Sequence, residues 1–135
     1  MEFDLNTKLN KTQATGLNPI VLAFVGDAVY SLYVRQKLVF FSDAKSGELN
    51  KLAVKEVKAS AQAELITKIM PLLTEEEISI FKRARNSKKT TKAKSATVTE
   101  YNLSTGFEAV IGYLYLIGEI NRINYLINEG NKNEN

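Results

Sequence analysis

Residues 18–34 read NPIVLAFVGDAVYSLYV, a nearly continuous apolar stretch in which Asp27 is the only charged residue. Asn18 is a typical helix-capping residue, and a proline at position 19 suits the first turn of a helix. We therefore predict a long apolar helix from Ile20 to about Val39, at the centre of the fold. The apolar run is shorter than the ~20 residues that a membrane-spanning helix needs, so no transmembrane segment is expected.

The rest of the chain also repeats its apolar residues at spacings of three and four, which predicts an all-α fold. We expect a bundle of about five to seven helices. Thr74-Glu75-Glu76-Glu77 is a capping box at the start of one of them, and Asn102 or Ser104 is the expected cap of another. Beyond the first helix, helices are predicted at residues 45–70, 74–86, 102–117 and 119–128.

The length of 135 residues and the hydrophobic content of 44% fit one domain with a single core. We assign this domain to residues 18–129, between an N-terminal segment (1–17) and a polar tail (130–135). The sequence contains no cysteine and no histidine, which excludes disulfides, a Ser-His-Asp triad and most zinc sites. The N-terminus is acidic and does not resemble a secretory signal, so a cytoplasmic protein is expected.

Two carboxylates lie in apolar helices that offer them hardly any polar face: Asp27 and Glu108. An isolated buried carboxylate costs several kcal/mol, so two of them indicate one shared cation. Gly26 and Gly112, beside these acids, indicate a close approach by a ligand or by a packed helix. Since only oxygen ligands are present, Mg²⁺ is the expected ion, with Mn²⁺ as a substitute. The alternative is that each acid pairs with a lysine or arginine of a neighbouring helix.

A second candidate site is a basic segment that contains no acidic residue, for which a polyanion is the expected partner. This segment runs from Lys82 to Lys94 and overlaps a predicted long loop at residues 87–99. The alternative is a solvated connector between two helices. The candidate contact residues are Lys82, Arg83, Arg85, Lys88, Lys89, Lys92 and Lys94.

Three segments together resemble the catalytic domain of the ribonuclease III family. Residues 24–29 read FVGDAV where the family has Leu-Gly-Asp-Ala-Val, and residues 107–112 read FEAVIG where it has Phe-Glu-Ala-Leu-Ile-Gly. Between them, residues 47–50 (GELN) resemble the family's Gly-Asp/Glu-Leu-Ser/Thr helix start. The likeness covers about residues 18–127. It is greatest to the small bacterial form that has no separate domain for binding double-stranded RNA.

This resemblance implies a homodimeric, magnesium-dependent endoribonuclease that cuts double-stranded RNA and matures the ends of 23S ribosomal RNA precursors. It implies that Asp27 and Glu108 are the catalytic, metal-binding residues and that the basic segment holds the RNA. The apolar helix around residues 21–34 is the candidate dimer surface.

The sequence departs from the family at three positions that are usually acidic, which predicts a thinner metal shell. Those positions are occupied by Ile20, Ala23 and Thr105. Thr105 or Ser104 could orient a water, although helix capping is the expected role of both hydroxyls. Two other functions stay open on these grounds. One is a non-catalytic RNA-binding or ribosome-assembly module with the same fold, and the other is a helical adaptor whose basic loop binds an acidic protein.

Overall fold

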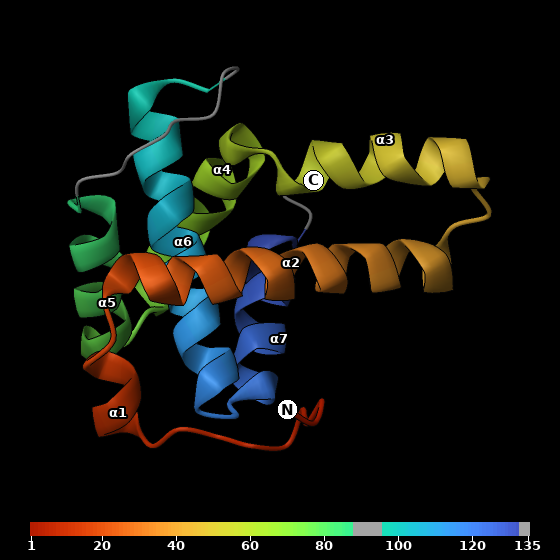
Figure 1. The fold of residues 1–135 in the computed structure, drawn as a ribbon. Helices are drawn as coiled ribbons and strands as arrows, with labels where there is room; N and C mark the ends of the chain where they lie inside the picture. The colour runs from red at the N-terminus through yellow and green to blue at the C-terminus, as the bar shows by residue number, and fades with distance from the viewer. Residues whose placement is uncertain (88–95, 133–135) are drawn as a thin grey trace.

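The computed structural model describes residues 1–87 and 96–132, and within them every regular secondary-structure element is a helix (Figure 1). This confirms the predicted all-α class. The helices in chain order are α1 (Lys11–Thr15), α2 (Pro19–Phe41), α3 (Ser46–Val57), α4 (Ala59–Ile69), the 3-10 turn η1 (Met70–Leu72), α5 (Glu75–Arg85), α6 (Val98–Leu116) and α7 (Ile120–Gly130). Within this part of the chain, no helix combines the length and the apolar character needed to cross a membrane.

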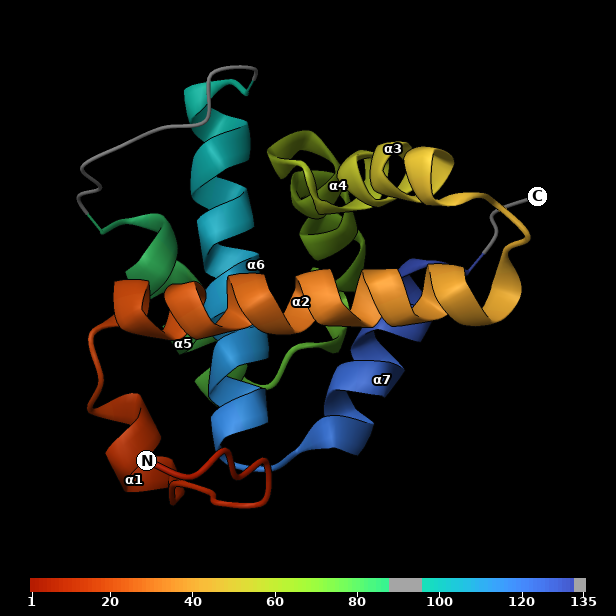
Figure 2. The ribbon, with the colours of Figure 1, turned by 45° about the vertical axis from the view of Figure 1, so that its right-hand side comes forward.

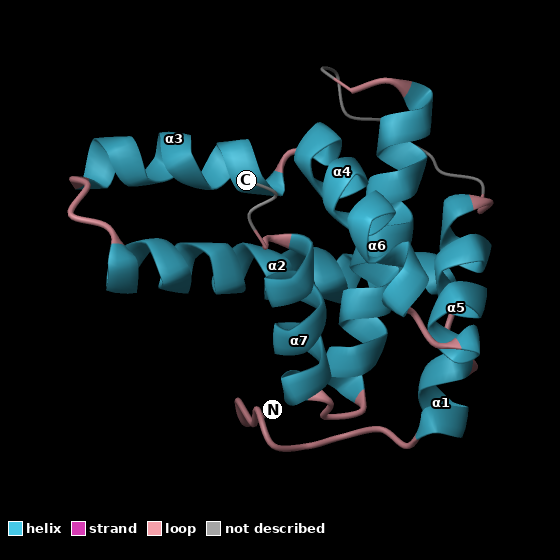
Figure 3. Cartoon of the chain, turned by 180° about the vertical axis from the view of Figure 1, so that it is seen from behind, coloured by secondary structure: helices cyan, strands magenta, loops and turns pink. Residues whose placement is uncertain are grey.

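Helix α6 is the centre of the bundle, since Phe107, Val110 and Ile111 have no exposed surface. Helix α2 crosses α6 and packs against it more extensively than any other pair of helices (Figure 2). Helices α4 and α5 also pack against α6, and α7 packs against both α4 and α6. The C-terminal half of α2 runs beside α3 as a two-helix arm that extends from the bundle (Figure 3).

The start of α2 follows the prediction. The Asn18 side chain accepts a hydrogen bond from the backbone N–H of Ile20 at 2.8 Å, and Pro19 occupies the first turn. The capping box of α5 is confirmed as well, because Thr74 and Glu77 exchange their two side-chain-to-backbone hydrogen bonds. These caps fix where the helices start, and hence which residues reach the core.

The single helix predicted from residue 45 to residue 70 is wrong, because the structure contains two helices there. Helix α3 ends at Val57, and Lys58 is extended, with ψ of 155°, before α4 begins. The side-chain amide of Gln62 donates to the Val57 carbonyl oxygen at 2.8 Å across this break. Apolar residues recur at helical spacing on both sides of Lys58, so periodicity alone could not show the break.

The predicted start of α6 is also wrong. Thr97 is the cap, forming a capping box with Glu100, and the helix begins at Val98. Asn102 and Ser104 therefore lie inside the helix, and the connection after α5 is shorter than predicted. The short helix α1 was not predicted.

Candidate active site

The site begins with two glycines where α2 crosses α6. A Cβ atom on Gly26 would lie 1.7 Å from the carbonyl oxygen of Glu108, and one on Gly112 would lie 1.9 Å from that of Leu22. No real side chain tolerates such distances, so the two backbones touch directly. The close approach expected at both glycines is therefore confirmed, and a packed helix makes it.

This crossing brings Asp27 and Glu108 together. Asp27 follows Gly26 in α2, and the backbone of Glu108 in α6 is the one that Gly26 contacts. Asp27 is exposed, whereas Glu108 is half-buried. Burial, together with the smaller contributions of the charge and the hydrogen bonding of Asp27, raises the pKa of Glu108 to about 8. Two acids that share one space in this way favour a shared proton or a shared cation.

The alternative partner for these acids, a basic side chain of a neighbouring helix, is not found. In residues 1–87 and 96–132, no lysine or arginine forms an ion pair with Asp27 or with Glu108. No basic side chain of the described residues therefore neutralises either acid.

A third polar group, Gln62 of α4, lies beside the pair. Its side chain is only 2% exposed, and its interaction with Glu108 lowers the pKa of that carboxyl, against the rise that burial and Asp27 cause. Its oxygen Oε1 is buried without a hydrogen-bond partner among the described residues. The sequence prediction missed Gln62, and the signal for it was a long polar side chain between the apolar positions 61 and 65 of an amphipathic helix.

These groups fit a magnesium ion by their chemistry. Within the described residues no cluster of three or more acidic, histidine or cysteine side chains could hold a metal. Magnesium, however, is commonly held by one or two carboxylates while it keeps several waters. The two carboxylates are therefore a sufficient donor set for this ion, though not for a metal that requires nitrogen or sulfur ligands.

The other positions considered from the sequence add no ligand. Ser104 and Thr105 are buried, and their hydroxyls donate to the Tyr101 carbonyl oxygen at 2.8 and 2.9 Å. Their expected role as helix caps is wrong, because both lie within α6. Each hydroxyl proton is engaged by the helix backbone, so neither is placed to donate to a substrate.

The predicted basic residues are only partly within the described residues. Lys82 is exposed on α5, whereas the guanidinium of Arg83 donates to the carbonyl oxygens of Thr15 and Leu17 at 3.1 and 3.4 Å. Arg85 stacks on the ring of Phe81, 5.3 Å from its centre. The remaining candidates lie outside the described residues: Lys88, Lys89, Lys92 and Lys94.

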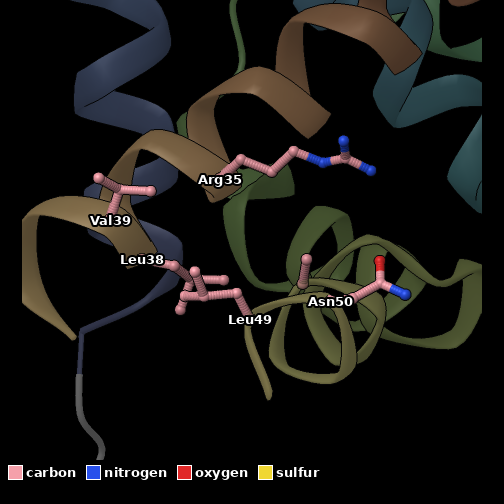
Figure 4. Close-up of a pocket in the computed structure, with 6 residues that line it drawn as sticks. Arg35, Leu38, Val39, Leu49 and Asn50 are labelled. Atoms are coloured by element: carbon pink, nitrogen blue, oxygen red, sulfur yellow. The ribbon is translucent and has the colours of Figure 1, made fainter. Parts of the chain in front are cut away.

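A hollow of about 270 Å³ lies elsewhere, between α2 and α3 in the arm (Figure 4). Its lining is mostly apolar, with Leu38, Val39 and Leu49 among its residues, and it includes neither candidate carboxylate. The acid pair lies instead where α2 crosses α6, and its Asp27 side chain is exposed to solvent. An open position of this kind suits a polymer better than a small enclosed substrate.

The chain belongs to the ribonuclease III family and is an endoribonuclease, because the ribonuclease III domain model matches residues 20–119. Its relatives include the Mini-ribonuclease 3 of Thermoanaerobacter, 48% identical over 94% of this chain and 90% of the relative. Another is the Mini-ribonuclease 3 of Clostridium tetani, 42% identical over 90% of this chain and 82% of the relative.

A solved structure supports the same fold. The crystal structure of protein FN1578 from Fusobacterium nucleatum matches with a TM-score of 0.77 and 37% identity, over 84% of this chain and 90% of that one. The family acts on double-stranded RNA. The family assignment expected from the three sequence segments is therefore confirmed.

Proposed function

We propose that this protein hydrolyses phosphodiester bonds in double-stranded RNA with Mg²⁺ held by Asp27 and Glu108. The observation that carries the proposal is the pairing of these two acids at the glycine crossing, with no basic side chain of the described residues paired to either. A bound Mg²⁺ would lower the pKa of a coordinated water and stabilise charge developing on the phosphate. Mn²⁺, which prefers the same oxygen ligands, is expected to substitute.

The residues of the chain have distinct tasks in this proposal. Asp27 is exposed and presents its carboxylate to the ion and to the approaching RNA, whereas the half-buried Glu108 is anchored by its surroundings. With a proton on Glu108 the pair would bind a cation poorly, since ligating carboxylates must be deprotonated. Cation binding and loss of that proton are therefore coupled.

The proposed RNA-binding surface is the basic segment from Lys82 to Lys94. Double-stranded RNA is recognised mainly through its shape, its phosphates and its 2′-hydroxyls, so a run of cations without acids suits it. Arg83 has a structural contact in addition, to the linker between α1 and α2. Binding should weaken as salt rises, because bound counterions are released from the RNA.

The proposed assembly is a homodimer through the exposed face of α2. Val21, Phe24 and Leu32 lie on this helix with exposed fractions of 45%, 79% and 63%. Such a row of exposed apolar side chains is typical of an interface, and a two-fold dimer would present two sites, each cutting one strand. Phe24→Glu should yield monomers in sedimentation experiments. A variant that remains dimeric would rule out this face.

The proposed natural substrate is a stem at the ends of the 23S ribosomal RNA precursor, processed in the cytoplasm. Support comes from the resemblance of the motifs to those of the small bacterial ribonucleases III. The test is incubation of the purified protein with a labelled stem of this kind, with and without Mg²⁺, beside the Asp27→Asn variant. Metal-dependent cleavage by the unmodified protein alone is expected. Equal cleavage by the folded variant would contradict the assigned site.

A further inference from the structure

Gln62 has an environment that its role in the core does not explain. Its side chain is 2% exposed, and its Nε2 donates a hydrogen bond to the Val57 carbonyl oxygen at 2.8 Å. Its Oε1 is buried and has no partner in the part of the chain that is described. Burying an unpaired amide oxygen is unfavourable, and an apolar side chain of similar size would avoid that cost.

The orientation of this amide follows from its neighbours. The nitrogen donates to the Val57 carbonyl oxygen at 2.8 Å, and the same side chain lies close enough to Glu108 to lower the pKa of that carboxyl. Turning the amide by 180° would place its oxygen against the Val57 carbonyl oxygen, so the observed orientation is the favourable one. The orphaned oxygen is therefore the consequence of directing the amide nitrogen at Val57.

The location of Gln62 also matters. It projects from α4, which packs extensively on α6, and it is buried, whereas Asp27, the other side chain that interacts with Glu108, is exposed. The amide carries no charge, so it can restrain the carboxylate without neutralising it and without adding to the repulsion between the two acids.

We propose that Gln62 is a positioning residue that holds the Glu108 carboxylate in the orientation needed to share one divalent cation with Asp27. This inference rests on the proposed metal-dependent function. It also gives a reason for the break at Lys58, because the break frees the Val57 carbonyl oxygen to accept from the same amide. Residues that orient metal ligands in this way commonly change metal affinity by about 10- to 100-fold when they are replaced.

The test replaces Gln62 by methionine, which keeps the length of the side chain but lacks the amide. Mn²⁺ affinity of the RNA-free protein is measured by electron paramagnetic resonance or calorimetry, and thermal stability is measured without metal. We expect Mn²⁺ affinity to fall by about tenfold or more, with little loss of stability because no buried amide oxygen is left unpaired. In cleavage, the Mg²⁺ concentration for half-maximal rate should rise by a similar factor, while the rate at saturating Mg²⁺ should change far less.

Leu65→Met is the matched control, since it alters a buried position of the same helix that faces Gly130 of α7. It should leave Mn²⁺ affinity unchanged. Gln62→Leu is the second variant, to be used if the methionine variant does not fold. Unchanged Mn²⁺ affinity in a folded Gln62 variant, beside normal binding by the unmodified protein, would overturn the positioning role alone. Absence of Mn²⁺ binding in the unmodified protein would overturn this inference together with the proposed metal site.

Discussion

Gly26 and Gly112 face each other across the α2–α6 crossing, and each would place a Cβ atom within 3 Å of the other's backbone nitrogen, at 2.8 and 2.9 Å. The contact is reciprocal, so neither helix can accept a side chain there unless the two helices separate. Because Asp27 follows Gly26 and Glu108 lies one turn before Gly112, the same contact sets the distance between the two acids. The packing of α2 on α6 and the geometry of the acid pair therefore both depend on the contact between Gly26 and Gly112.

Gly26→Ala should accordingly separate the helices and disrupt the acid pair. The free energy of unfolding should fall by at least ~2 kcal/mol, as expected for overpacking against a rigid backbone, and RNA cleavage should be lost. Gly47→Ala is the control, because a Cβ there meets nothing within 4 Å and alanine favours the helix. Chemical denaturation of both variants is the measurement. Equal stability of the two variants would contradict the described contact.

Glu108→Gln should change how stability of the metal-free protein depends on pH. The pKa of Glu108 is raised to about 8 by burial and by Asp27, above its ordinary value of 4.5. Its contribution to stability is then fully present below about pH 4.5 and is lost as pH rises through about 8. The variant should be more stable than the unmodified protein at pH 8, by several kcal/mol, with little difference near pH 4.5. Parallel pH profiles for the two proteins would contradict this environment for Glu108.

The Glu77–Arg122 pair should be the main ionic contribution to the stability of the fold. Glu77 is 3% exposed and receives hydrogen bonds from the guanidinium at 2.8 and 3.0 Å, while Arg122 also donates to the Leu72 carbonyl oxygen at 2.7 Å. Removing one partner leaves a buried charge, so Arg122→Met should cost about 3 kcal/mol of unfolding free energy. The double variant Glu77→Leu with Arg122→Met should recover part of that loss. Additive losses in the double variant would show that the pair is not coupled.

The same pair predicts a loss of stability in acid. Burial alone would raise the pKa of Glu77, but the hydrogen bonds from Arg122 and Thr74 outweigh it and hold the pKa below the ordinary value. This contribution is therefore present above the ordinary pKa of a glutamate and is lost as pH falls through the lowered value. Denaturation series at falling pH should show the Arg122→Met variant losing less stability than the unmodified protein.

Two neighbouring cations of α5 should differ in their roles. Lys82→Ala should weaken duplex RNA binding and reduce the slope of log affinity against log salt by about 1, if it contacts one phosphate. Arg83→Met should also lower thermal stability, because it loses the hydrogen bonds to Thr15 and Leu17. Binding isotherms at several salt concentrations and melting curves separate the two effects. If the slope of log affinity against log salt is unchanged in the Lys82 variant, Lys82 does not contact the RNA.

The general fold was predictable from sequence because its signals are local. The cap at Asn18, the capping box at Thr74 and the long apolar run fixed α2 and α5 almost to the residue. The break at Lys58 was not predictable from periodicity, since both flanking helices bury faces with the same spacing. The Thr97–Glu100 capping box was visible in the sequence but lay inside a segment read as a basic loop.

The candidate site was predictable in its charged members and not in its neutral one. Asp27 and Glu108 stand out as lone acids in apolar helices, and the glycines beside them indicate the crossing. Gln62 was missed because a glutamine in an amphipathic helix carries no charge to mark it, and its relation to Glu108 comes from the packing of α4 on α6. The structural contact of Arg83 was missed for a similar reason, since its partners are backbone carbonyls distant in sequence.

The most direct test of the central claim is calorimetric titration of the RNA-free protein with Mn²⁺, beside the folded Asp27→Asn and Glu108→Gln variants. The acid pair predicts binding by the unmodified protein and a large loss of affinity in both variants, because each removes one of two carboxylate ligands. Binding that persists at the unmodified affinity in both variants would contradict a metal site shared by Asp27 and Glu108.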